Sequence, residues 1–240
     1  MLQVKDLVVG YEQRVLIRNL FLSVPAPAFV AIVGHNGSGK TTLFKALTGS
    51  ISYRGHILVK DQELKSFSNP AASGLLSYLP QKNSVTFPIK VHDLVVMGLF
   101  RKKRFFEQYS NQDYAVAIQV LERLQITHLK DREFTELSGG EQQLIWLAQL
   151  ILQDAAICLL DEPTQQLDIY HKKRVFNLLE SWVQENSKTV LCITHDLFNL
   201  HGHNGYLLNV SKPKPHLEIL TSETIQENIT FLEMQPAYNL

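Results

Sequence analysis

Residues 28–41 read AFVAIVGHNGSGKT, and this stretch decides the fold class of the protein. Its apolar first half predicts a buried strand and its second half a glycine-rich loop, while TLFKALTG at 42–49 predicts a short helix closed by a glycine. A strand, such a loop and a helix in this order form a P-loop, which binds the phosphates of a nucleotide. We therefore expect an α/β fold with a nucleotide site at this loop.

The residue types inside the loop suit a nucleoside triphosphate with magnesium. Gly34, Gly37 and Gly39 let the backbone turn its N–H groups toward phosphates, and the start of the helix adds its positive dipole end. The Lys40 ammonium can reach the β- and γ-phosphates, and the Thr41 hydroxyl suits Mg²⁺. A purely structural glycine turn is the alternative, and such a turn seldom matches the whole motif in this context.

Two carboxylates follow another apolar run, ICLL at 157–160. This run predicts a strand that carries Asp161 to the carboxyl edge of the sheet, where ligands bind in open α/β folds. Asp161 would there complete the Mg²⁺ site. Glu162 comes next, and a carboxylate beside a magnesium ligand suits the group that polarises an attacking water. The alternative is an acid pair in a surface turn.

Two more polar residues end predicted strands, Gln81 after LLSYLP and His195 after VLCIT. A glutamine at a strand end can contact Mg²⁺ and water, and a histidine there can hydrogen-bond a γ-phosphate. Each residue alone is more often an ordinary loop residue. Their place at the same predicted sheet edge as Lys40 and Asp161 favours a role in the site.

The remaining pattern predicts a mostly parallel sheet with an inserted helical region. Continuously apolar runs such as FVAIV, ICLLD and VLCIT are typical of central strands, and helical stretches such as 169–186 separate them. Between about 91 and 153 the pattern is helical, which predicts an all-helical lobe, and 221–240 predicts a short helix and tail. Further strands are expected at 2–9, 56–61, 75–80, 205–210 and 216–220.

Composition and charge argue against several classes of function. The chain has 45% hydrophobic residues, and its 23 basic residues balance 23 acidic ones, so no bulk field attracts nucleic acid or an anionic membrane. Cys158 and Cys192 lie in apolar runs and suit buried thiols in a reducing cytosol. The N-terminus lacks a signal-peptide pattern, and no run approaches the roughly 20 apolar residues of a membrane span. We expect an intracellular protein.

A second anion-binding pattern, LSGGEQQ at 137–143, places a serine and two glycines at an expected helix start. The motifs that carry a family resemblance are the P-loop at 34–41, Gln81, LSGGE at 137–141, ICLLDE at 157–162, QQLD at 165–168 and His195. Together they make the chain resemble the nucleotide-binding subunits of ABC transporters from Tyr11 to about Asn209. The resemblance implies one ABC ATPase domain over 1–240, with the helical subdomain at about 91–153 and an antiparallel β region near the N-terminus.

The resemblance also implies that two copies pack head to tail. Each ATP would then lie between the P-loop of one copy and the LSGGE of the other, so that ATP holds a homodimer together and hydrolysis releases it. The residues implied at the nucleotide are Tyr11 (stacking on adenine), Gly34, His35, Asn36, Gly37, Ser38, Gly39, Lys40, Thr41, Thr42, Ser138, Gly139, Gly140 and Asp168. The implied magnesium ligands are Thr41, Gln81 and Asp161, and the implied catalytic residues are Glu162, His195 and Gln81.

Three positions depart from the family pattern. His35 stands where proline is usual in the P-loop, and its side chain can point away from the phosphates. Gln165 replaces a small residue at the start of the D-loop, and Gln149 replaces an arginine after the signature motif. None of these changes removes a reacting group, but the two glutamines bear on coupling across the dimer.

Weaker resemblances concern the cargo. TFPIKVHDLVVMG at 86–98 resembles subunits of metal and metal-chelate importers, and LDIYHKKRVFNLL at 167–179 resembles those for iron–siderophore, haem and cobalamin uptake, with Lys172 where glutamine is usual. We therefore expect an iron-chelate importer that works with integral-membrane permease subunits, and indirectly with a substrate-binding protein, at the inner face of the cell membrane. The alternatives are a zinc or manganese importer, a soluble ATPase of iron–sulfur cluster assembly, and a scaffold without hydrolysis.

The helical lobe and residues 82–106 are expected to receive the membrane partner. RKKRFFEQ at 101–108 mixes four cations with two phenylalanines, which fits either a solvated helix end or contact with that partner or lipid headgroups. Two histidines in HGHNG, His201 and His203, more often occupy a plain loop than a metal site.

Overall fold

A computed structural model of the protein describes residues 1–11, 14–67, 69–70, 73–104 and 106–234. Its central feature is a six-stranded sheet in the order β10-β9-β3-β8-β7-β6. The strands are β3 (Ala28–Val33), β6 (Leu76–Leu79), β7 (Ile157–Asp161), β8 (Thr189–Ile193), β9 (Tyr206–Asn209) and β10 (Leu217–Ile219). Neighbours pair in parallel except β10, which pairs antiparallel with β9. The predicted mostly parallel sheet is confirmed.

The three continuously apolar runs occupy the middle of this sheet. Every residue of β3, β7 and β8 is buried, because helices or a second sheet cover both faces. Cys158 and Cys192 are buried free thiols in β7 and β8, and burial raises the pKa of the Cys158 thiol to about 11. Both thiols are therefore protonated and unreactive at neutral pH.

An antiparallel sheet precedes and flanks the P-loop strand. It contains β1 (Leu2–Tyr11), β2 (Arg14–Val24), β4 (Arg54–Val59) and β5 (Gln62–Glu63), with β1 between β2 and β4. β2 is not among the strands expected from the sequence, because register shifts between β1 and β2 interrupt its alternation. The strand expected at 56–61 ends earlier, since Lys60 and Asp61 have φ of 50° and 63° and turn the chain into β5.

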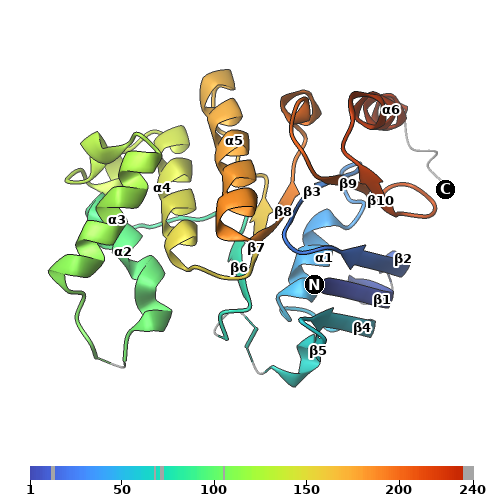
Figure 1. The fold of residues 1–240 in the computed structure, drawn as a ribbon, viewed down its shortest axis with the longest axis horizontal. Helices are drawn as coiled ribbons and strands as arrows, with labels where there is room; N and C mark the ends of the chain where they lie inside the picture. The colour runs from blue at the N-terminus through green and yellow to red at the C-terminus, as the bar shows by residue number, and fades with distance from the viewer. Residues whose placement is uncertain (12–13, 68, 71–72, 105, 235–240) are drawn as a thin grey trace.

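The helices divide between the sheet and a separate lobe. They are α1 (Lys40–Leu47), α2 (Val91–Val96), α3 (Asn111–Arg123), α4 (Gly139–Leu152), α5 (Ile169–Asn186) and α6 (Ser222–Glu233). Figure 1 shows α2, α3 and α4 gathered on the left, beyond α5, with the sheets on the right. The described residues of 91–153 form helices and turns without a strand, and one isolated bridge pairs Glu133 with Lys90, which directly precedes this range.

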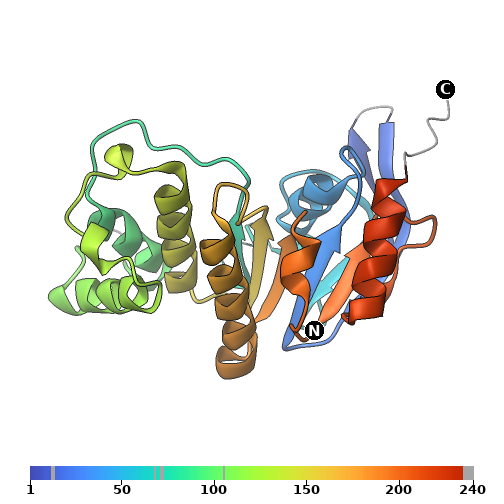
Figure 2. The same cartoon turned by 90° about the horizontal axis from the view of Figure 1, so that it is seen from above.

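Alternating residues of β3 belong to two hydrophobic layers. Ala28, Val30 and Ile32 pack with α1 and the antiparallel sheet. Phe29, Ala31 and Val33 pack with α5 and continue into the core of the helical lobe. Figure 2 shows the same arrangement from above, with α5 next to the strands of the central sheet. The strand that leads into the P-loop is therefore clamped from both sides.

The C-terminal helix α6 lies against β9 and β10. It begins with a capping box between Thr221 and Thr224. The predicted short helix is present, while residues 235–240 of the expected tail lie outside the described residues. None of the helices in the described part of the chain combines the length and apolarity required to cross a membrane.

The contact between α5 and the sheet can be tested at Phe176. Its buried ring meets Phe29 of β3 edge-on, with the ring centroids 6.4 Å apart. Phe176→Ala should lower the free energy of unfolding by about 3–5 kcal/mol, because it removes a buried ring and leaves a cavity. Urea denaturation measures the change. The matched Phe198→Ala, at a side chain that is 73% exposed, should change stability by less than about 0.5 kcal/mol. Equal effects would contradict this packing.

Candidate nucleotide-binding site

The P-loop connects the end of β3 at Val33 with the start of α1 at Lys40. Gly37 and Gly39 have φ of 78° and 99°, which other residue types rarely adopt. A Cβ at Gly39 would also lie 3.0 Å from the Ile17 side chain of β2. Both glycines are thus required by the path of the backbone, as the motif predicts.

Lys40 points back along the loop. Its ammonium donates hydrogen bonds to the carbonyl oxygens of Gly34 at 2.8 Å and His35 at 3.1 Å. Burial lowers the pKa of Lys40, and the nearby carboxylates of Glu162 and Asp161 partly offset this effect. The lysine is therefore a buried cation placed beside two acids at the mouth of the loop.

Thr41 and Asp161 meet at the start of α1. The Thr41 hydroxyl donates to Asp161 Oδ2 at 2.8 Å, and the Tyr78 hydroxyl lies 3.5 Å from the same oxygen. Asp161 is only 1% exposed, and its Oδ1 is buried without a hydrogen-bond partner. Burial raises the pKa of Asp161, and hydrogen bonds from Thr41 and Tyr78 oppose that shift. A hydroxyl, a carboxylate and an unsatisfied buried oxygen are hard donors that fit Mg²⁺.

Glu162 brings together the three predicted catalytic residues. Its Oε2 accepts a hydrogen bond from Gln81 Nε2 at 2.9 Å, and its Oε1 lies 3.1 Å from His195 Nε2. Its backbone has a φ of 53°, an uncommon value for glutamate, and its N–H donates to the Ile193 carbonyl at 3.0 Å. Side chains from the ends of β6, β7 and β8 thus converge on one carboxylate.

The hydrogen bonds of Gln81 are with the catalytic group. Its amide donates to Glu162 and reaches Gln165 Oε1 at 3.5 Å, so both of these acceptors lie on the Glu162 side of the site and not at the Thr41–Asp161 pair. Its role as a magnesium ligand therefore stays a prediction. His195 is 49% exposed in its side chain, while Glu162 is 14% exposed, so the histidine forms the open side of the pair.

Other residues expected at the nucleotide lie around the loop. Tyr11 ends β1 and is 44% exposed, and the ammonium of Lys45 on α1 is 5.5 Å from its ring centroid. Thr42 is buried in the first turn of α1, and the Ser38 hydroxyl is buried without a partner. Tyr11 is therefore next to the helix that follows the loop, and stacking on adenine remains a prediction.

LSGGE begins α4 as expected. Ser138 is the N-cap, its hydroxyl donates to Glu141 Oε2 at 2.7 Å, and its N–H donates to the same oxygen at 2.8 Å. A Cβ at Gly139 would lie 2.5 Å from Gln166 Oε1, so the Gln166 side chain of the D-loop packs directly on the helix start. A pocket of about 540 Å³ opens here, and Asp168 and His171 border it.

This signature pocket is separate from the P-loop of the same chain. All its lining residues come from 138–144 and 166–171. Asp168 also caps α5, because its carboxylate accepts from the His171 N–H at 2.8 Å. The structure thus brings Asp168 together with Ser138, Gly139 and Gly140, and places Lys40, Thr41, Asp161 and Glu162 in a second group.

Two sets of contacts near Glu162 were not predicted from the sequence. Tyr78 reaches Asp161 from β6, and its place inside an apolar strand gives no signal of a polar partner. Lys172 donates to Asp196 Oδ1 at 2.7 Å, and the Thr164 hydroxyl donates to Asp196 Oδ2 at 2.5 Å. Lys172 was noticed as a departure from the family pattern, and here it anchors the loop that carries His195.

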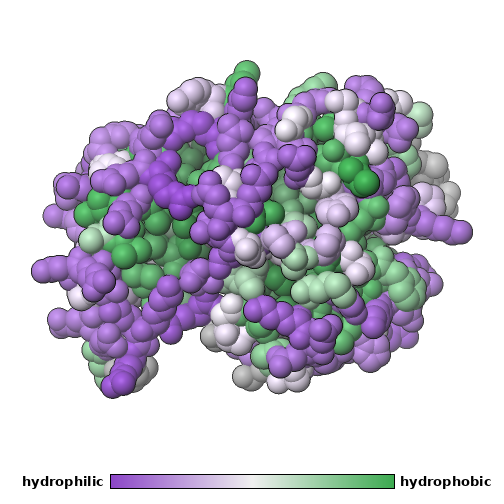
Figure 3. All heavy atoms as spheres, in the orientation of Figure 1, coloured by the Kyte–Doolittle hydropathy of each residue, from purple (hydrophilic) through white to green (hydrophobic). Residues whose placement is uncertain are grey.

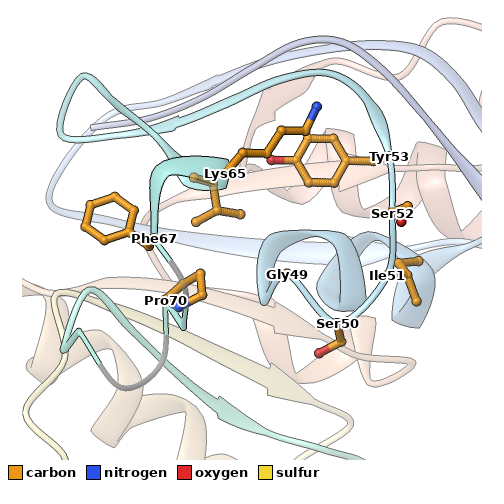
Figure 4. Close-up of a pocket in the computed structure, with 9 residues that line it drawn as sticks. Gly49, Ser50, Ile51, Ser52, Tyr53, Lys65, Phe67 and Pro70 are labelled. Carbon is orange, nitrogen blue, oxygen red and sulfur yellow. The ribbon is translucent and has the colours of Figure 1, made fainter.

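Another pocket lies at the opposite end of α1 from the P-loop. Figure 4 shows Tyr53 and Lys65 on its wall, with the Lys65 ammonium 4.4 Å from the Tyr53 ring centroid. Its volume is about 470 Å³, and its lining residues are Gly49, Ser50, Ile51, Ser52, Tyr53, Leu64, Lys65, Phe67 and Pro70. No residue predicted at the nucleotide lines it.

The other departures from the family pattern also have partners in the structure. Gln149 on α4 donates to the Leu94 carbonyl at 2.9 Å, which ties α4 to α2 inside the helical lobe. Three of the four cations at 101–104, Arg101, Lys102 and Lys103, bond to the Gln153 carbonyl, to Asp154 and to Asp113. His203 pairs with Glu180 at 2.7 Å. These groups serve local structure.

Comparison with known proteins decides the family. The family profile described as ABC transporter matches residues 17–165, which include the P-loop, the LSGGE motif, Asp161 and Glu162. The chain belongs to the ABC transporter family. The family resemblance seen in the sequence is confirmed, and with it the expectation of an ATP-binding ABC ATPase. Asp168 and His195 lie beyond the matched range.

Similar proteins include ATP-binding proteins named for ferric enterobactin, iron(3+)-hydroxamate and manganese transport. The achromobactin transport ATP-binding protein CbrD of Dickeya dadantii is 32% identical over 80% of this ABC ATPase and 72% of its own length. The manganese transport system ATP-binding protein MntB of Halalkalibacterium halodurans is 30% identical over 88% of this chain and 82% of its own length. An inward-facing transporter assigned to the metal-chelate type superimposes with a TM-score of 0.79 at 32% identity, covering 97% of this chain and 88% of that one. The predicted ABC ATPase fold is confirmed.

The buried carboxyl of Asp161 should cost the nucleotide-free protein stability. Because its pKa is raised in the folded state, the folded protein loses stability as pH rises from the ordinary aspartate range through that raised pKa. Asp161→Asn should therefore raise the melting temperature at pH 7 without nucleotide, and the gain should shrink as the pH is lowered. Thermal melts at several pH values measure this.

Asp113 provides the matched control with the opposite sign. Hydrogen bonds from Lys103 and Ser110 lower the pKa of this half-buried carboxyl to about 2. Asp113→Asn should therefore lower the melting temperature at pH 7. An Asp161→Asn protein that melts below the wild type at pH 7 would contradict the burial argument.

Proposed function

We propose that this ABC ATPase couples ATP hydrolysis to uptake of an iron chelate, of siderophore, haem or cobalamin type, or of a metal ion. The observation that carries the proposal is the convergence of Gln81 and His195 on Glu162. It occurs at the sheet edge that also holds Lys40 and the Thr41–Asp161 pair. One carboxylate with two polar partners beside a phosphate loop is the arrangement that hydrolysis of a triphosphate requires.

Lys40 and the loop backbone would bind the phosphates. The Lys40 ammonium now bonds to two backbone carbonyls, and phosphate oxygens can replace these acceptors without moving the side chain far. The N–H groups at the start of α1 add a positive potential at the same point. Tyr11 would contact the adenine from the end of β1.

Thr41 and Asp161 would hold magnesium, with Gln81 as a further proposed ligand. The two oxygens of the Thr41–Asp161 pair are 2.8 Å apart, and Asp161 has a second, unsatisfied oxygen. Magnesium, when bound, offsets the charge that spreads over the phosphate oxygens during transfer. A divalent cation would also favour the ionised form of Asp161, which burial alone disfavours.

Glu162 would orient the attacking water and accept its proton. Its two oxygens already bond to Gln81 and His195, so the carboxylate is fixed in direction before the nucleotide arrives. His195 would hold Glu162 and reach the γ-phosphate. General-base assistance of this kind contributes about 10²–10⁴-fold to a rate.

The signature residues would serve a second copy of the chain. Their pocket contains no P-loop residue, although Ser138 and two glycines at the start of a 14-residue helix suit an anion. A head-to-tail homodimer, with Asp168 at its seam, would place each ATP between the P-loop of one copy and the Ser138, Gly139 and Gly140 of the other. The P-loop of each copy and the signature residues of each copy would then both contact a nucleotide.

The helical lobe would receive an integral-membrane permease subunit. Its surroundings include exposed hydrophobic side chains, among them Phe87, Met97, Phe100 and Phe106. Figure 3 shows hydrophobic surface gathered over the lobe within a hydrophilic surround. Such a patch on a chain of zero net charge favours a protein partner over nucleic acid. The subunit would therefore lie on the inner face of the cell membrane, and a substrate-binding protein would act indirectly.

The similar proteins support the order of cargo candidates. The relatives named for ferric enterobactin and iron(3+)-hydroxamate transport, together with the metal-chelate type transporter, favour an iron chelate. Manganese is the second candidate, because a manganese transport protein matches at 30% identity over 88% of this chain. Affinity purification from membranes solubilised in detergent tests the assignment. A polytopic membrane protein should co-purify, whereas soluble scaffold proteins alone would favour iron–sulfur cluster assembly.

The role of Glu162 predicts a trapped complex. Glu162→Gln keeps the side-chain shape but removes the proton acceptor, so turnover of Mg-ATP should fall by about 10²–10⁴-fold while ATP binding persists. Light scattering should show a dimer under saturating ATP. Glu185→Gln is the control, because this exposed residue on α5 makes a surface ion pair with Arg123 at 3.5 Å and is not among the residues proposed at the nucleotide. Turnover within tenfold of wild type in Glu162→Gln would disprove the role.

The shared site predicts that Ser138 acts only between copies. Ser138→Arg places a bulky side chain in the signature pocket, which should abolish ATP-dependent dimers and lower turnover at least about tenfold. Binding of ATP to a single copy should stay within about twofold, since no P-loop residue lines that pocket. Fluorescent ATP titration and light scattering measure the two effects. Loss of ATP binding by the single copy would show that Ser138 serves its own nucleotide.

A further inference from the structure

His35, which stands where proline is usual, ties the P-loop to the end of the chain. Its backbone N–H donates to Ser211 Oγ at 2.8 Å. Its ring nitrogen Nε2 lies 3.2 Å from the Met234 carbonyl, and its ring centroid is 5.9 Å from that of Phe231 on α6. Figure 2 shows α6 on the same side of the molecule as the loop between β3 and α1. The His35 ring therefore faces α6.

A buried polar network fixes Ser211. Its N–H donates to Asn209 Oδ1 at 2.9 Å, and Asn209 Nδ2 donates to Asn228 Oδ1 of α6 at 2.8 Å. Asn209 and Asn228 are 1% and 0% exposed. Asn228 Nδ2 also donates to Glu218 at 3.0 Å. Because buried amides are costly unless bonded, this network holds one geometry, and the Ser211 hydroxyl has a defined place.

Two adjacent P-loop residues, Gly34 and His35, are contacted by both Ser211 and Lys40. A Cβ at Gly34 would come within 2.9 Å of Ser211 Oγ, so the hydroxyl packs against the first residue of the loop and bonds to the second. The carbonyls of Gly34 and His35 are the acceptors of the Lys40 ammonium. Ser211 therefore fixes the orientation of the peptide groups that position Lys40.

Proline at position 35 could not make this bond, because proline has no backbone N–H. The His35 N–H and the Ser211 hydroxyl thus work as a pair, and the His35 ring adds a second contact with α6. The departure from the family pattern has a structural counterpart 176 positions later in the chain.

We propose that Ser211 and α6 are positioning elements of the ATP site. They hold Gly34 and His35 in the conformation that binds phosphate, although they contact no nucleotide themselves. This inference rests on the proposed binding of ATP at the P-loop. Preorganising a loop raises affinity by removing the cost of ordering it. A net hydrogen bond of ordinary strength corresponds to about three- to tenfold in affinity.

The experiment compares Ser211→Ala, His35→Ala and His35→Pro in the full chain with Mg-ATP. Ser211→Ala should raise KM for ATP about three- to tenfold while kcat stays within about twofold, because the reacting groups are unchanged. His35→Ala removes only the ring contact and should have a smaller effect. Since His35→Pro already lacks the bond, adding Ser211→Ala to it should raise KM no further.

Phe231→Ala is a second route that leaves Ser211 and its network intact. It removes the ring that faces His35 and should raise KM for ATP about two- to threefold. His201→Ala, at an exposed histidine outside α6 and the Ser211 network, is the control and should match the wild type. Melting temperatures without ATP separate loss of stability from loss of affinity.

Two outcomes would overturn the inference. If the variants lower the melting temperature but keep the wild-type KM for ATP, α6 only stabilises the fold. If the double variant His35→Pro with Ser211→Ala is additively worse than either single variant, the two groups do not act as a pair. Wild-type protein that fails to bind ATP would instead disprove the proposed function itself, and the inference would fall with it.

Discussion

The register of three parallel strands is the constraint on which the site depends. Ile193 of β8 pairs with Ile32 of β3 on one side and with Asp161 of β7 on the other. The ladder continues one step beyond, because the Thr194 N–H donates to the Ile32 carbonyl and the Glu162 N–H donates to the Ile193 carbonyl. These bonds align the residues that follow each strand. A slip of one residue in either pair would turn the reacting side chains to the wrong face.

Patterns local in the sequence predicted most of the fold and the centre of the site. Continuous apolar runs marked β3, β7 and β8, and the glycine spacing marked the loop that follows β3. The contacts that escaped prediction join distant positions. Tyr78 meets Asp161 83 positions away, and His35 meets Ser211 176 positions away. No pattern within a strand or loop signals such partners, and the register shifts of β2 hid its alternation in the same way.

The site contains charged side chains at buried positions. Asp161 and Lys40 are 1% and 7% exposed. Burial raises the pKa of Asp161 and lowers the pKa of Lys40, which favours the neutral form of each side chain. Opposite charges close together offset part of this cost, while one carboxylate oxygen remains unsatisfied. A triphosphate with its cation would supply the missing partners. Without nucleotide, the site therefore lowers the stability of the protein locally, but it is complementary to its ligand.

The two-sided burial of β3 limits how this protein can be altered. Each of its six residues packs into one hydrophobic layer or the other, so the strand has no neutral face. A change of volume at any of these positions would displace a layer and, through Val33, the anchor of the loop that follows. Substitutions are better tolerated at outward-facing positions of β1, β2 and α3, where half or more of the side chains are exposed or half-buried. Libraries aimed at expression or solubility belong there.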